Sequence, residues 1–200
     1  MTNRPNIVFF LVDDMGYGDV SCLNPEGKIS TPNFDRLARQ GMSFTDAHST
    51  SAVCSPSRYS LLTGRYNWRS TLQAGIVGLY GEPLIAPDRD TLPKLLRRHG
   101  YHTACIGKWH LGMGWDFEVT KDFLPDRPRD LEGFEGDPEE AERRKATWKN
   151  AFSRPVKGGP LAAGFDHYFG VDVPNWPPYC FLEDDRVQGV PSEWLPARLL

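Results

Sequence analysis

Three short groups of residues carry side chains with the potential for chemistry, and the first is a pair of carboxylates. Asp13 and Asp14 directly follow the apolar run at residues 6–12. Adjacent carboxylates repel each other unless a cation or several donors compensate the charge, and hard divalent cations such as Ca²⁺ or Mg²⁺ prefer such oxygens. The simpler alternative is that Asp13 caps a turn and Asp14 is solvated.

The second group is CSPSRYSLLTG, in which Cys54 stands at the predicted start of a helix and Arg58 follows one turn later. Free backbone N–H groups and the helix dipole stabilise negative charge at a helix start. Residues four apart share a helix face, so the two side chains outline an anion pocket that contains a reactive atom. The alternative is an inert, buried cysteine beside an arginine that solvates the helix end.

The third group, GKWHLG, supplies Lys108 and His110 at the end of a predicted strand. Positions two apart on a strand share a face of the sheet. Lysine can hold an anion, and histidine can move a proton near neutral pH. The alternative is an exposed lysine and a structural histidine. Trp176 and Tyr179 either contact a substrate or serve packing.

Alternating strand and helix patterns are expected to position these groups. Helices are predicted at 32–40, 55–63 and 92–98, and strands at 6–12, 42–49 and 101–110, the first of them buried on both faces. Thr31 and either Asp90 or Thr91 are expected to cap helices, and Gly41 and Gly64 to end them. The alternation predicts an α/β domain with a mainly parallel sheet, in which Asp13, Asp14, Lys108 and His110 gather at the carboxyl ends of strands.

Later segments predict surface structure rather than further layers. Residues 118–157 are charged and proline-rich and are interpreted as a surface excursion with one exposed helix that starts near Pro138. The aromatic, proline-punctuated stretch at 164–186 is expected to form loops that pack over the domain or line a cleft.

Composition limits the class of protein. The 200 residues carry a net charge of −3 without a long basic block, which predicts no nucleic-acid partner and no membrane partner. The four cysteines form no C-x-x-C pair, so neither a zinc ribbon nor a disulfide framework is predicted. The apolar run at 6–12 is too short to cross a membrane and lacks a signal-peptide layout. The expected location is therefore cytoplasmic as given, or periplasmic or secreted if a leader is missing.

Taken in order, VDDMGYGD, CSPSRYSLLTGR, GKWHLG and GFDHYFG resemble the formylglycine-dependent (type I) sulfatases, of the arylsulfatase-like kind. The most specific element is C-x-P-x-R at Cys54, Pro56 and Arg58. The resemblance implies an alkaline-phosphatase-like α/β fold, a mainly parallel sheet flanked by helices, incomplete in this chain. Residues 1–200 would form the N-terminal part of a single catalytic domain.

The resemblance also implies a chemistry. A formylglycine-generating maturation enzyme would oxidise Cys54 to Cα-formylglycine, whose hydrate attacks the sulfur of a sulfate monoester and later releases sulfate by elimination. Asp13, Asp14 and residue 54 would bind the metal, usually Ca²⁺, with Mg²⁺ as the alternative. Arg58 would steady the hydrate, Lys108 would bridge it to a sulfate oxygen, and His110 would take a proton during elimination.

The expected function is hydrolysis of a sulfated small molecule or carbohydrate. Two alternatives stay open: a phosphonate or phosphate ester hydrolase of the same superfamily, and a non-catalytic fragment or remnant. Further metal and sulfate ligands of the family find no match here, so the 200-residue chain alone is expected to be inactive and poorly folded. Loops at 75–89 and 171–185 are expected to recognise the leaving group.

Overall fold

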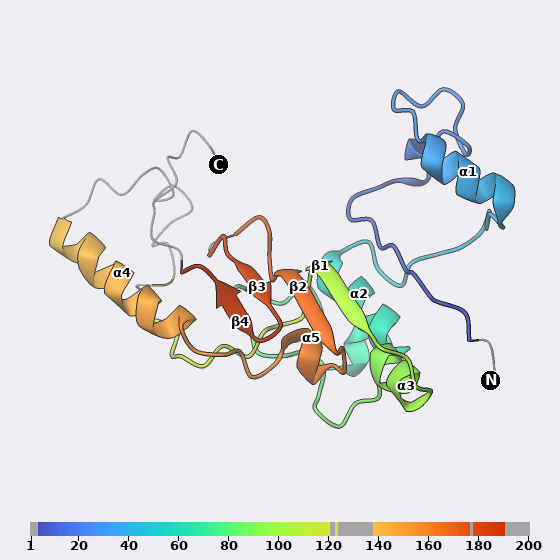
Figure 1. Ribbon diagram of the computed structural model, residues 1–200. Coiled ribbons are helices and arrows are strands. Elements are labelled where there is room, and N and C mark those ends of the chain that lie inside the picture. The colour runs from blue at the N-terminus through green and yellow to red at the C-terminus, as the bar shows by residue number, and fades with distance from the viewer. Residues whose placement is uncertain (1–3, 121–122, 124–137, 177, 191–200) are drawn as a thin grey trace. The chain divides into compact units, whose positions relative to one another are not determined.

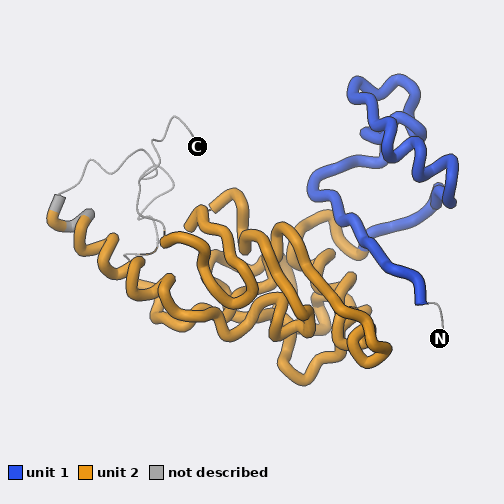
Figure 2. Tube along the Cα trace, viewed as in Figure 1, with its two compact units in different colours: residues 1–49 blue, residues 50–200 orange. Residues whose placement is uncertain are grey.

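The computed structural model describes residues 4–120, 123, 138–176 and 178–190. The chain divides into two compact units, Met1–Ser49 and Thr50–Leu200 (Figure 2), and each is described by itself. No helix among the described residues is long and apolar enough to cross a membrane.

The first unit contains a short 3₁₀ helix, η1 (Tyr17–Asp19), and the helix α1 (Pro32–Gln40), with Thr31 at the N-cap and Gly41 at the C-cap, as predicted. The strands expected at 6–12 and 42–49 are wrong, because neither segment is a strand in the structure. Ile7 and Phe10 are 58% and 75% exposed, whereas a strand buried on both faces was expected. Apolar composition favours a strand only where a partner supplies backbone hydrogen bonds, and no strand among the described residues pairs with either segment.

The second unit is built on a four-stranded sheet with the order β1-β2-β3-β4 (Figure 1). The strands are β1 (Ala104–Lys108), β2 (His167–Val171), β3 (Phe181–Glu183) and β4 (Arg186–Gln188). β1 and β2 are parallel, and the other two pairs are antiparallel, so the described sheet is mixed. The strand predicted within 101–110 is confirmed, whereas the loops expected at 164–186 are wrong where β2, β3 and β4 occur.

The two faces of this sheet differ. Tyr168 and Leu182 are each 1% exposed and belong to the main apolar core, while Ile106, Phe169 and Phe181 alternate with the buried positions and are exposed. β1 and β2 approach closely where Gly170 pairs with Gly107, and a Cβ on Gly170 would clash with the Gly107 carbonyl. Gly170 is therefore needed for this pairing, whereas Gly107 has open space around it and is favoured by its positive φ of 107°.

The remaining elements of the second unit are helical. α2 (Cys54–Thr63) ends at Gly64 in the left-handed conformation, and η2 (Asn67–Arg69) follows. α3 (Leu92–Arg98) begins after Thr91, whose hydroxyl accepts a hydrogen bond from the Lys94 amide, so Thr91 rather than Asp90 is the cap. α4 (Pro138–Phe152) starts where predicted, and α5 (Gly159–Ala162) precedes β2.

An aromatic cluster forms a second, smaller core. Tyr80, Phe123 and Phe152 are buried together, and Phe117 packs against them. Because Ala151 and Phe152 at the end of α4 are buried, this helix is more than an exposed excursion.

Candidate active site

The amino end of α2 and the carboxyl end of β1 bring three of the predicted residues together. The Lys108 ammonium nitrogen Nζ lies 3.0 Å from Sγ of Cys54. Arg58, one turn into α2, donates from Nη1 to the Lys108 backbone carbonyl at 2.6 Å. Arg58 therefore holds the end of β1 against α2, and the Lys108 side chain reaches back to Cys54. The anion pocket expected at Cys54 and Arg58 stays a prediction, to which the structure adds Lys108 as a neighbour of Cys54.

His110 lies next to this pair along the chain and is 3% exposed. Its φ of 55° takes the backbone out of the strand conformation, so strand alternation does not decide the direction of its side chain. Its Nε2 lies 3.0 Å from the Val77 carbonyl oxygen. A carbonyl can only accept, so this contact assigns the proton to Nε2 and leaves Nδ1 as the basic nitrogen of the neutral ring.

Ser55 is a positioning residue that the sequence did not reveal. Its hydroxyl donates to the His110 carbonyl at 2.8 Å and accepts from the Val77 amide at 3.0 Å. The residue is fully buried. One side chain thus joins the first turn of α2 to the backbone of His110 and to the segment that contacts the imidazole. Its partners are distant in sequence, and serine after cysteine carries no signal for such contacts.

Asp13 and Asp14 belong to the first unit, where both are exposed. Among the residues that the structure describes, no group of three or more His, Cys, Asp or Glu is arranged to hold a metal ion. Two adjacent carboxylates fit the oxygen preference of Ca²⁺ but supply only part of the six to eight ligands that it takes. The predicted set of Asp13, Asp14 and Cys54 draws on both units and stays a prediction.

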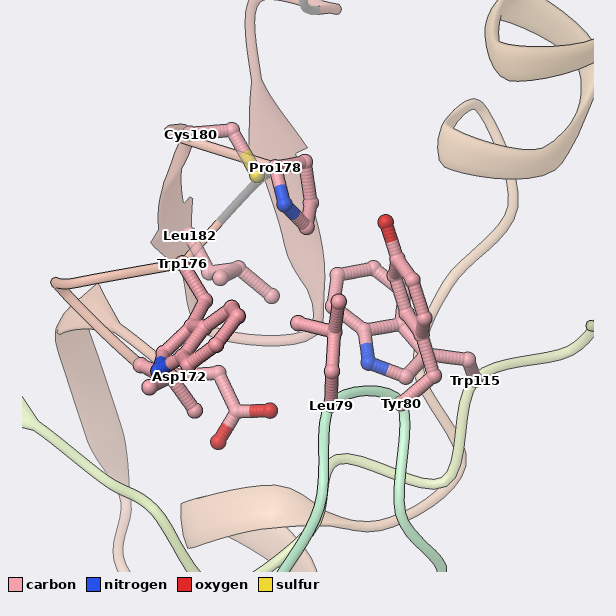
Figure 3. Close-up of a pocket in the computed structure, with 9 residues that line it drawn as sticks. Leu79, Tyr80, Trp115, Asp172, Trp176, Pro178, Cys180 and Leu182 are labelled. Atoms are coloured by element: carbon pink, nitrogen blue, oxygen red, sulfur yellow. The ribbon is translucent and has the colours of Figure 1, made fainter. Parts of the chain in front are cut away.

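A small pocket lies beside His110, and its walls come from the two loops expected to recognise a leaving group and from Trp115, which lies outside both. Figure 3 shows Leu79, Tyr80 and Trp115 on one side and Asp172 and Trp176 on the other. The pocket volume is about 10 Å³. His110 donates its backbone N–H to the Asp172 carbonyl at 3.1 Å, which fixes this wall to the histidine.

Asp172 is a carboxylate that lines this pocket, and the sequence analysis assigned it no role. Burial raises the pKa of its carboxyl to about 6, against the smaller opposing effect of the His110 backbone N–H. The sequence could have indicated a role for Asp172, because the residue directly follows β2. A loop was expected there instead, so this role was missed.

Comparison with known proteins decides the family. A family profile described as Sulfatase matches residues 5–181, which is most of the chain. The chain belongs to the sulfatase family. The predicted resemblance is therefore confirmed.

Two relatives and one solved structure show how much of a sulfatase is present. An N-acetylgalactosamine-6-O-sulfatase of Bacteroides thetaiotaomicron is 46% identical over 113 residues, which are 56% of this chain and 22% of the relative. Arylsulfatase G of Rattus norvegicus is 48% identical over 111 residues, which are 54% of this chain and 20% of the relative. The chain thus spans about a fifth of the length of these relatives.

The solved structure comes from work on the metabolism of multiple glycosaminoglycans by Bacteroides thetaiotaomicron. It matches with a TM-score of 0.72 and 33% identity over 96% of this chain and 33% of that chain. The similarity supports the predicted fold class, an α/β sulfatase fold of which this chain contains a part.

Proposed function

We propose that this sulfatase-family chain supplies the nucleophile region of an enzyme that hydrolyses sulfate monoesters. The observation that carries the proposal is the 3.0 Å contact between Lys108 Nζ and Cys54 Sγ at the start of α2. Helix N-termini and ammonium groups both stabilise anions, so a sulfate group bound here would meet positive charge from two directions.

Cys54 is proposed to be the substrate of a formylglycine-generating maturation enzyme, and its Sγ then marks the place of the oxygen that replaces it. The hydrated aldehyde would supply an oxygen nucleophile for sulfur and a second hydroxyl that permits elimination of sulfate. Lys108 holds a sulfate oxygen, and Arg58 positions Lys108 through its carbonyl. His110, with its proton on Nε2, accepts a proton at Nδ1.

Asp13 and Asp14 are proposed as ligands of Ca²⁺. A bound cation would supply positive charge that lowers the pKa of a hydroxyl ligand. The partner is proposed to be a sulfated small molecule or carbohydrate. The relatives and the sulfatase family profile support this substrate class.

The test is turnover of 4-nitrophenyl sulfate by the full-length enzyme that contains this chain, co-expressed with a maturation enzyme, because the 200-residue chain alone is expected to be inactive. Cys54→Ala is expected to lower kcat by more than about 1,000-fold, because the attacking group is removed. Cys22→Ala, which changes an exposed cysteine of the first unit, is the matched control and should keep full activity.

Two results would overturn the proposal. One is an unmodified thiol at position 54 by mass spectrometry in protein that still turns over sulfate esters. The other is a large preference for an aryl phosphodiester in a parallel assay, which would favour the phosphate ester hydrolase alternative.

A further inference from the structure

The pocket beside His110 contains two buried polar atoms of opposite kind. Oδ1 of Asp172 is an acceptor and Nε1 of Trp115 is a donor, and neither has a hydrogen-bond partner among the described residues. Both residues line the same pocket (Figure 3). A buried polar group without a partner destabilises the protein, because its lost hydrogen bonds to water are not replaced. A hydroxyl group both donates and accepts, so a single hydroxyl has the chemistry that matches both atoms.

The size and charge of the pocket limit the chemical groups that can bind in it. A volume of about 10 Å³ is the space of one water molecule or one hydroxyl group and excludes an aromatic ring. The carboxyl of Asp172 would repel a sulfate, so the pocket does not bind the anionic end of the substrate. What fits is a neutral hydroxyl on the remainder of the molecule.

The position of the pocket ties it to the proposed chemistry. His110 contacts one wall through the Asp172 carbonyl and approaches the other through Val77, two residues before Leu79. Trp176 lines the pocket and is 45% exposed, which leaves an apolar surface for the body of a ligand.

We propose that this pocket binds one hydroxyl group of the leaving alcohol, with Trp176 against its ring, and that the substrate is therefore a carbohydrate sulfate. The proposal rests on the proposed function. It predicts that the site prefers a sugar to a simple aryl leaving group. A phenol carries no second hydroxyl to place between Asp172 and Trp115.

The experiment compares kcat/KM for N-acetylgalactosamine 6-sulfate with kcat/KM for 4-nitrophenyl sulfate. Asp172→Ala and Trp176→Ala are each expected to lower the ratio of the two values by about 10- to 100-fold, through the KM of the sugar sulfate. Protein that merely folds less well loses both activities in proportion, so the ratio is insensitive to misfolding.

Two control substitutions are matched by residue type. Trp68 is a tryptophan of η2 that is 50% exposed, and Glu142 is an exposed carboxylate on α4. Trp68→Ala and Glu142→Ala should leave the ratio unchanged. An unchanged ratio in Asp172→Ala overturns the inference, since a bound water then satisfies the pocket and no substrate hydroxyl does.

A binding measurement separates failure of this inference from failure of the proposed function. In the Cys54→Ala background, where no turnover is expected, Asp172→Ala should weaken binding of the sugar sulfate by at least about tenfold in calorimetry. If binding weakens in this way while the matured enzyme with Cys54 intact shows no sulfatase activity, the pocket is supported and the proposed function is rejected. Equal affinities with and without Asp172 would reject the pocket, whatever the activity.

Discussion

The carboxyl of Asp172 should make the stability of the protein depend on pH. Its pKa is 3.8 in the unfolded chain and about 6 in the folded one, because burial disfavours the ionised form. Tyr168 and Cys180 are neighbouring titratable groups, and both are neutral at pH 7, since burial raises their already high pKa values further. The folded state therefore binds the Asp172 proton more tightly, and the free energy of unfolding falls as pH rises from about 4 through 6.

Asp172→Asn tests this dependence. The amide cannot ionise, so the variant should gain up to about 3 kcal/mol of unfolding free energy at pH 7.5, and this gain should vanish near pH 4. Urea unfolding at several pH values measures the difference. A gain that stays constant across the pH range would contradict the titration. Such a cost in stability at neutral pH is typical of a group retained for binding.

Ser55 shows how much one short side chain can connect. Ser55→Ala leaves the Val77 amide and the His110 carbonyl without their buried hydroxyl partner and should cost about 1–3 kcal/mol of unfolding free energy. Ser60→Ala is the control on the same helix. Within the described part of the chain, the Ser60 hydroxyl donates to the Pro56 carbonyl of its own helix, so its loss should cost less than about 1 kcal/mol. If both variants lost the same free energy of unfolding in chemical denaturation, the contacts of the Ser55 hydroxyl to His110 and Val77 would contribute no extra stability.

At the level of elements, helices were predictable and most strands were not. Thr91 and Gly64 mark helix ends through contacts within a few residues, so the sequence carries their signals locally. β3 and β4 have three residues each, follow the proline-rich segment near Pro178, and are held by partners across the sheet. At residues 6–12 the error is the reverse: the composition predicts a strand, and the described structure has none there.

The end of α2 offers a quantitative test of this local control. Gly64 has a φ of 66°, and a Cβ built there would meet nothing within 4 Å. Gly64→Ala should therefore cost only the strain of the left-handed backbone, about 1 kcal/mol of unfolding free energy. Gly78 also has open space around it but no positive φ, so Gly78→Ala should be neutral or slightly stabilising. Thermal unfolding of both variants decides the point, and equal effects would rule out backbone strain as the cause.

For the whole molecule, local patterns predicted α2 and β1, the elements that carry Cys54, Arg58 and Lys108. The resemblance to sulfatases is what placed the three residues in one site. The hydrogen bond from Arg58 to the Lys108 carbonyl now gives that expectation a geometry. The pocket at Asp172 was not predictable, since it depends on the approach of three segments, around Leu79, Trp115 and Asp172, that are far apart in sequence. The expected metal set of Asp13, Asp14 and Cys54 remains a prediction for the same reason: chain segments far apart in sequence have to be placed.

The exposed face of the sheet determines how the 200-residue chain should behave in solution. Ile106 is 74% exposed and pairs in register with Phe169, whose ring stacks on that of Phe181 at 5.4 Å. Contiguous apolar surface of this kind is rare on a soluble monomer and binds other apolar surfaces. The isolated 200-residue chain should therefore bind an apolar fluorescent dye strongly and self-associate at micromolar concentration.

The double variant Ile106→Thr, Phe181→Thr keeps strand-compatible residues while it removes most of this surface, so dye fluorescence and light scattering should both fall several-fold. Val119→Thr changes an exposed apolar residue outside the sheet and should alter neither signal. If the double variant bound as much dye as the unaltered chain, the apolar surface responsible would lie elsewhere, and the run at 6–12, exposed along its whole length, would be the next segment to substitute.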